Sequence, residues 1–175
     1  VLYDDFNTYI MNTAAFAIEL FQTYEDLQML YQPNDIYKSL CKNMREQQEE
    51  EDGDESSAIF EKFTPVINEL NSADDPCALI AIFMILDSIQ DYCINAIIEE
   101  FDSIQELFVK GISSGEPIIL EIVATLIESF CKSDSSIACT ILSVCEPVLI
   151  QFTEHDFVVD ALKEIYDYSE REPLN

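Results

Sequence analysis

Apolar residues recur along this chain at helical spacing, and short polar turns separate the apolar stretches. The most apolar stretch opens at Pro76, and every residue from Cys77 to Leu86 is apolar. A second apolar stretch opens at Pro117, 41 residues further on. Both prolines follow an acidic residue, a pattern typical of a helix N-terminus, and we expect Asp75 to cap the first of these helices. β-branched residues follow the same 3.6-residue period, so the sequence predicts an all-α fold.

The N-terminal residues 2–31 are predicted to form one or two helices. Their main apolar stripe comprises Phe6, Ile10, Ala14, Ile18 and Phe21. Tyr9 and Phe16 widen the apolar arc, so this helix either is sandwiched between other helices or meets a second molecule. Pro33 is expected to stop it and Asp35 to cap a short amphipathic helix that follows.

Residues 45–57 form the most polar stretch, and their like charges predict an exposed loop. Asp52, Asp54 and Glu55 lie close together, as the ligands of a calcium site would. An EF-hand loop, however, needs its glycine at position 6, and here Gly53 falls between the two aspartates, so the motif does not match. We therefore expect no metal and no cofactor. Ser56 or Ser57 is expected to cap the helix after this loop.

The remaining chain is predicted to be helical between polar turns. The expected helices span 58–70, 77–90, 92–100, 102–112, 117–131 and 157–168. Pro65 is expected to kink or divide the first of them, and Pro147 to break a helix of the third unit described next.

Three stretches each contain a helix, a short polar turn and a longer apolar helix. They are PVINELNSADDPCALIAIFMILDSI, SIQELFVKGISSGEPIILEIVATLIESF and PVLIQFTEHDFVVDALKEIYDYS. This three-helix unit of about forty residues resembles the armadillo repeat, or its two-helix relative, the HEAT repeat. The chain lacks the family's glycine between the first two helices, and it has no Trp, so the Trp-Asn ladder of nuclear import receptors is absent.

The length of 175 residues predicts one domain, 1–175, and the resemblance implies that it is built as a right-handed α-solenoid of about three repeats. Its parts are an N-terminal helical cap at 1–45, the acidic loop at 46–57, and repeats at 58–91, 92–132 and 133–170.

The chain carries 35 acidic and 8 basic residues, a formal net charge of −27. This charge repels phosphate backbones and anionic membranes, so we expect neither nucleic-acid nor membrane binding. It favours a protein partner with a basic segment. Alternatively, the acidic residues only keep an apolar solenoid soluble.

The six cysteines form no C-x-x-C pair, and most lie in apolar helical stretches. Their even number permits disulfides, but a chain of this size with an apolar core does not need them, so we expect structural thiols in an intracellular, cytoplasmic protein. The start of the sequence shows no signal peptide, and no uncharged run approaches the roughly 20 residues of a membrane span. Because the sequence begins with Val, we expect a fragment or a processed form.

In armadillo-like solenoids the last helix of each repeat lines a concave groove, so the resemblance implies where a partner would bind. Glu121, Thr125 and Glu128 share one helix face through their spacing. The full set of predicted partner-binding residues is Asp87, Asp91, Glu121, Thr125, Glu128, Asp160, Glu164 and Asp167. Together they could hold Lys or Arg side chains of an extended peptide. Alternatively, they are ordinary solvent-facing positions.

No catalytic arrangement is apparent. The single histidine, His155, lies in a predicted turn, and the three dispersed glycines form no phosphate loop. We therefore expect a non-catalytic protein-interaction scaffold that binds a basic or extended segment along an acidic concave face. The alternatives are a module that forms a homodimer through its apolar N-terminal helix, or a fragment of a longer solenoid. Salt separates groove binding from apolar self-association, because only the former is screened.

Overall fold

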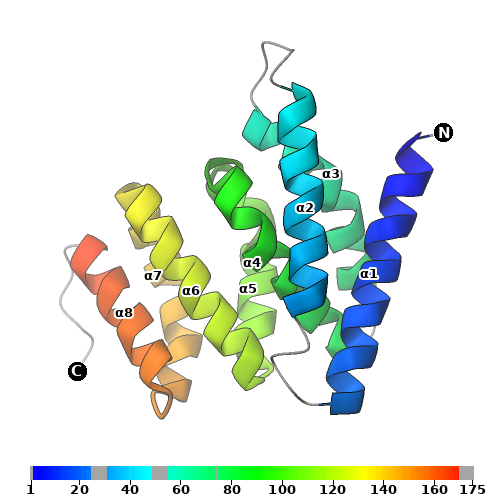
Figure 1. The fold of residues 1–175 in the computed structure, drawn as a ribbon. Coiled ribbons are helices and arrows are strands. Elements are labelled where there is room, and N and C mark those ends of the chain that lie inside the picture. Colours follow the sequence, from blue (N-terminus) through cyan, green and yellow to red (C-terminus); the bar gives the residue numbers. More distant parts are fainter. Residues whose placement is uncertain (1, 25–30, 49–54, 74, 170–175) are drawn as a thin grey trace. The chain divides into compact units, whose positions relative to one another are not determined.

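The computed structural model describes residues 2–24, 31–48, 55–73 and 75–169. Within these ranges every regular element is a helix (Figure 1), which confirms the all-α prediction. The chain forms two compact units, Val1–Ala96 and Ile97–Asn175.

The first unit contains three complete helices and most of a fourth. They are α1 (Leu2–Tyr24), α2 (Tyr31–Gln48), α3 (Glu55–Ser72) and α4 (Pro76–Glu99), which contributes its residues up to Ala96. The first three helices pack against one another in pairs. The ring of Phe63 on α3 meets the rings of Phe6 and Tyr37 edge-on, at centroid distances of 5.7 and 6.3 Å. This aromatic cluster joins the three helices.

Helix α4 begins as the sequence predicts. The Asp75 carboxylate accepts a hydrogen bond from the backbone N–H of Cys77 at 2.9 Å, and Pro76 is the first helical residue. Residues 78–86 are all buried, which confirms that an all-apolar helix is covered on its sides. The helical backbone is interrupted at Cys93, where φ is −142° and ψ is 31°, close to the predicted division between two helices.

Polar contacts fix α2 against α4. The hydroxyl of Ser88, fully buried on α4, donates to the side-chain oxygen of Asn34 at 2.9 Å. The ammonium of Lys38 lies 3.5 Å from the carboxylate of Asp91. The backbone oxygen of Met84, on the same helix, also lies within hydrogen-bonding distance of the Ser88 hydroxyl, at 2.7 Å, so the buried hydroxyl has a partner within α4 and the Asn34 contact adds a polar link to α2.

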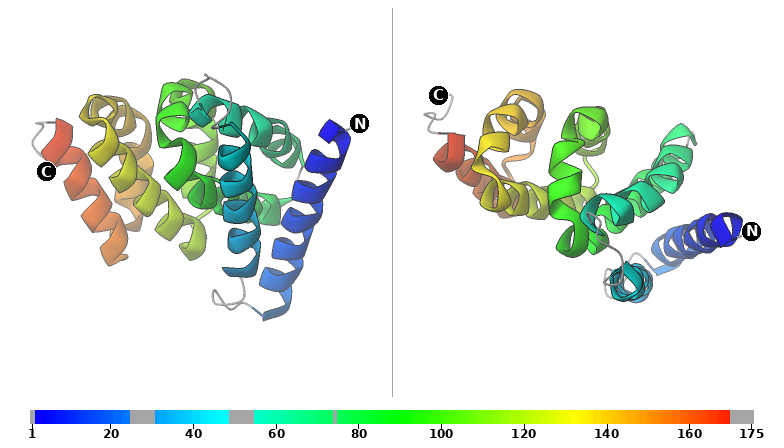
Figure 2. Two further views of the ribbon diagram at one scale, coloured as in Figure 1. Left: turned by 45° about the horizontal axis from the view of Figure 1, so that its top comes forward. Right: turned by 90° about the horizontal axis from the view of Figure 1, so that it is seen from above.

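The second unit consists of two antiparallel helix pairs. They are α5 (Phe101–Ser113) with α6 (Pro117–Ser133), and α7 (Ala138–Leu149) with α8 (Asp156–Ser169). Helix α6 lies beside α8, and α5 lies beside α7, so the unit has two layers (Figures 1 and 2). Short 3-10 helices, η2 (Ser135–Ile137) and η3 (Ile150–Phe152), flank α7.

Aromatic residues fill the core between α5 and α6. The rings of Phe101, Phe108 and Phe130 lie 5.3 to 6.3 Å apart between centroids, and all three side chains are buried. The turn between the two helices passes through Gly115, whose φ of +67° favours glycine. A Cβ at this position would lie 3.2 Å from the ring of Phe152, so the turn also requires a small residue.

Proline breaks helices less often here than the sequence predicts. Pro33 does not stop a helix: it lies in the first turn of α2, where no backbone N–H is needed. Pro65 lies inside α3, which continues through it as one helix. Pro147 does not break its helix either, because α7 continues to Leu149 and then tightens into η3.

The bounds predicted for the acidic loop, 45–57, are wrong at both ends. Helix α2 extends to Gln48, and α3 begins at Glu55, so Ser56 and Ser57 lie within its first turn rather than capping it. The Ser56 hydroxyl instead donates to the backbone oxygen of Tyr92. Residues 49–54, with the calcium-like aspartates, lie outside the described residues.

Candidate functional site

Three of the predicted binding residues lie along one face of α6. Glu121 and Thr125 are exposed, and the Thr125 hydroxyl donates back to the Glu121 backbone oxygen at 3.1 Å. Glu128 follows on the same face, with its carboxylate partly exposed. This face of α6 therefore carries two carboxylates, two helical turns apart.

A lysine links this face to α8. The Nζ of Lys132 lies 3.3 Å from Oε2 of Glu128 and 3.9 Å from Oε1 of Glu164. The hydrogen bond to Glu128, together with the nearby carboxylate of Glu164, raises the pKa of Lys132 above its usual value. The structure thus brings Glu128 and Glu164 together around one ammonium group. Sequence reasoning missed Lys132, although its i,i+4 spacing from Glu128 was a readable signal.

The corresponding face of α8 carries two further predicted residues. Asp160 and Asp167 are exposed and share the helix face of Glu164 through their spacing. We name this combined surface the acidic face. It comprises Glu121, Thr125, Glu128, Asp160, Glu164 and Asp167, with Lys132 between the helices.

The other two predicted residues belong to the first unit and have partners there. Asp87 accepts a hydrogen bond from the side-chain amide of Gln90 at 3.0 Å. Asp91 pairs with Lys38 on α2. Asp91 therefore links α4 to α2, whereas the contact of Asp87 lies within α4.

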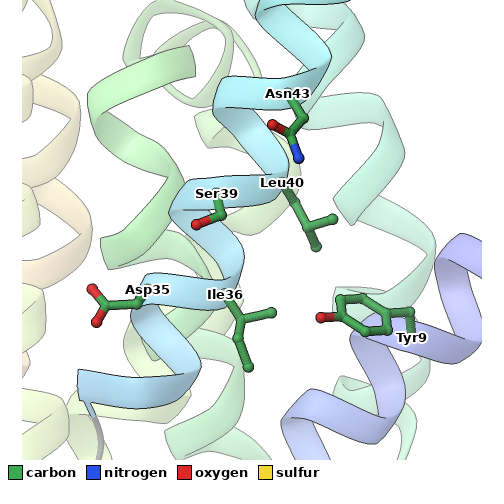
Figure 3. Close-up of a pocket in the computed structure, with 6 residues that line it drawn as sticks. All are labelled: Tyr9, Asp35, Ile36, Ser39, Leu40 and Asn43. Carbon is green, nitrogen blue, oxygen red and sulfur yellow. The ribbon is translucent and has the colours of Figure 1, made fainter.

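A groove of about 320 Å³ lies between α1 and α2 (Figure 3). It is lined by Tyr9, Asp35, Ile36, Ser39, Leu40 and Asn43. The Tyr9 side chain, 49% exposed, extends from α1 toward Ile36 and Leu40 on α2. The groove is the second candidate surface.

Helix α1 is covered on one side only. Ile10, Ala14 and Ala17 are fully buried, while Phe16 is 38% exposed two turns beyond Tyr9 on the same face. The alternative in which other helices sandwich α1 is therefore not seen among the described residues. The sequence pattern predicts the wide apolar arc of this helix, but it does not predict which side chains of the arc stay exposed to solvent.

The single histidine has structural partners. Its ring stacks on Phe157 at a centroid distance of 5.0 Å, and its Nε2 lies 3.8 Å from the Glu154 carboxylate. The His155 backbone oxygen accepts from the N–H groups of Val158 and Val159 at the start of α8. Elsewhere in the described ranges, no group of three or more His, Cys, Asp and Glu side chains could hold a metal ion.

All six cysteines are free thiols. Four of them are buried in helices: Cys41, Cys93, Cys131 and Cys145. Burial raises the pKa of the Cys41 and Cys145 thiols to about 12 and that of Cys131 to about 11. A thiol with so high a pKa is a poor nucleophile at neutral pH, so these side chains act as small apolar groups.

Two helical segments of the described chain are long and apolar enough to span a membrane. They are Pro76–Glu99 and Ser135–Phe152, and 72% and 33% of their apolar windows are buried inside the protein. Core helices of water-soluble proteins have the same length and composition, and the burial of α4 is of that kind.

Comparisons with known proteins add no relative: no protein-family model, curated protein or solved structure matches this chain. The resemblance to armadillo and HEAT repeats therefore stays a prediction from the sequence pattern. Function has to be inferred from the acidic face and the groove themselves.

Proposed function

We propose that this chain is a non-catalytic protein-interaction module whose acidic face binds Lys and Arg side chains of a partner segment. One observation carries the proposal. Carboxylates of Glu128 and Glu164, on two different helices, lie within 4 Å of one ammonium group, that of Lys132. The spacing between α6 and α8 therefore suits a cation placed between them.

The charge of the chain supports the same partner. A net charge of −27 attracts basic segments over long range and speeds their encounter. Exposed ion pairs are individually weak, so binding needs several contacts along an extended segment. Carboxylates distributed over α6 and α8, such as Glu121 and Asp160, supply those contacts.

The proposal also covers the fold class, because the helix pairs of the second unit are arranged like neighbouring repeats. In the second unit α6 lies beside α8 and α5 beside α7, as equivalent helices do when repeats stack. This arrangement is compatible with an armadillo- or HEAT-like solenoid. We propose that the solenoid is right-handed and intracellular, as expected from the sequence, and that helices like α6 and α8 form its concave binding face.

A peptide titration of the full chain tests the function. A short fluorescent peptide of alternating Lys and Arg is titrated at about 20 mM and about 500 mM salt, with a Gln-substituted peptide as control. The double variant E121Q/D160Q removes two exposed carboxylates of the acidic face. The matched control, E69Q/E106Q, removes two exposed carboxylates of α3 and α5.

At low salt we expect E121Q/D160Q to weaken binding about fivefold, and E69Q/E106Q to change it by less than about twofold. Equal losses in both variants would mean that only net charge attracts the peptide, and the acidic face would lose its proposed role.

A further inference from the structure

The groove between α1 and α2 is a second surface, in the other unit and of a different chemistry. Residues 6–18 form the longest uncharged run in a chain of net charge −27. Their outward face leaves Tyr9 and Phe16 exposed, at 49% and 38%. Exposed aromatic residues at helical spacing are typical anchor points of protein interfaces.

The groove has the form that a helix requires. The Tyr9 ring forms one wall, and α2 forms the other (Figure 3). Ile36 and Leu40, one helical turn apart, are the apolar part of the α2 wall, which also carries Asp35, Ser39 and Asn43. A groove between two helices accepts apolar side chains that recur once per turn of a docked helix.

The charges around the groove favour a helix flanked by basic residues over a second copy of this chain. Asp5 and Glu19, both exposed, bound the uncharged run on α1, and exposed Asp35 lies on the α2 wall. If two copies met through this face, their acidic residues would oppose each other. Lys or Arg residues flanking an apolar helix would instead be attracted.

We propose that the groove binds an amphipathic helix of a partner protein. Two apolar side chains at i and i+4 lie between Tyr9 and the Ile36–Leu40 wall, and flanking basic residues face Asp5, Glu19 and Asp35. This inference does not depend on the acidic face, because its residues lie in the first unit.

The test uses the full chain and designed helical peptides. The probe carries Leu at i, i+4 and i+7 with Lys at both ends. One control peptide replaces the Leu residues with Ser, and another replaces the Lys residues with Glu. The protein variants are Y9S in the groove and F16S on the same face of α1, two turns beyond the groove residue Tyr9. The matched control is I150S, because Ile150 is 46% exposed in the second unit. Circular dichroism checks that each variant is folded.

We expect Y9S to weaken binding of the Leu/Lys peptide about tenfold and F16S by a smaller factor, with I150S within about twofold of wild type. We expect E121Q/D160Q to leave this binding unchanged, which separates the groove from the acidic face. Equal affinity of Y9S and wild type would overturn the proposal. So would sedimentation showing a dimer that Y9S dissociates, because a second copy would then be the occupant.

Discussion

The hydroxyl of Tyr166 on α8 donates a hydrogen bond to Oε1 of Glu146 on α7. Glu146 is 6% exposed, and it is the single charged residue between Ser135 and Phe152. A buried carboxyl group needs a hydrogen-bond donor, so this contact joins the two helices of the last pair.

Removing the donor should destabilise the second unit. We expect Y166F to lower the free energy of unfolding by about 1 to 3 kcal/mol, because it takes a hydrogen-bond donor from a buried carboxyl group. We expect E146Q to lower the free energy of unfolding by less, since its amide oxygen still accepts the hydrogen bond from the Tyr166 hydroxyl. Urea unfolding followed by circular dichroism measures both. A Y166F variant as stable as wild type would show that the contact is not needed.

Replacing Lys132 should strengthen partner binding. Its ammonium occupies the space between Glu128 and Glu164, where the proposed function places a partner cation. We expect K132Q to bind the Lys/Arg peptide about two- to fivefold more tightly at low salt. The control K163Q removes an exposed lysine from α8, one residue before Glu164. Unchanged or weaker binding of K132Q would contradict this prediction. An equal gain in K163Q would contradict it as well, because the gain would then come from net charge alone.

Thiol reactivity should follow burial. With a disulfide-exchange reagent at neutral pH, exposed Cys139 should react first and half-buried Cys77 next. The other four thiols should react only on unfolding, and mass spectrometry of the labelled chain counts them. Rapid labelling of Cys145 in the folded protein would contradict its burial and its raised pKa.

Stability should fall at alkaline pH. Burial raises the pKa of the Cys145 thiol from its ordinary 9.0 to about 12, so the folded state favours the neutral thiol. This contribution is complete below the unfolded pKa of 9.0 and is lost as pH rises toward 12. Between about pH 9 and 11, each such thiol should lower the free energy of unfolding by about 1 kcal/mol for each unit that the pH rises. Urea midpoints of C145A should therefore fall less steeply with pH than those of wild type. Parallel slopes would contradict this.

The sequence predicts those features of the fold that depend on neighbouring residues. The α4 start at Pro76, with its Asp75 cap, and the α6 start at Pro117 follow from local turn chemistry. The break predicted at Pro33 is wrong because Pro33 lies in the first turn of α2, where no backbone N–H is needed. The break predicted at Pro147 is wrong because α7 continues to Leu149 although proline removes one backbone hydrogen bond there.

The candidate site depends on contacts distant in sequence, which a single sequence does not reveal. Asp91 is predicted to line the binding groove, and nothing near it in the sequence signals its ion pair with Lys38 on another helix. Spacing placed Glu128 and Glu164 on helix faces, but only packing of α6 against α8 brings them to one lysine. The exposure of Tyr9 likewise depends on which helices cover α1.

Nuclear magnetic resonance mapping tests the central claim, that the acidic face of α6 and α8 binds a basic segment. The isotope-labelled full chain is titrated with the Lys/Arg peptide at low salt, and backbone amide shifts are followed residue by residue. We predict that the largest shifts fall at Glu121, Thr125 and Asp160 and disappear at high salt. Shifts confined to the acidic stretch 45–57, or spread evenly over the chain, would contradict the account.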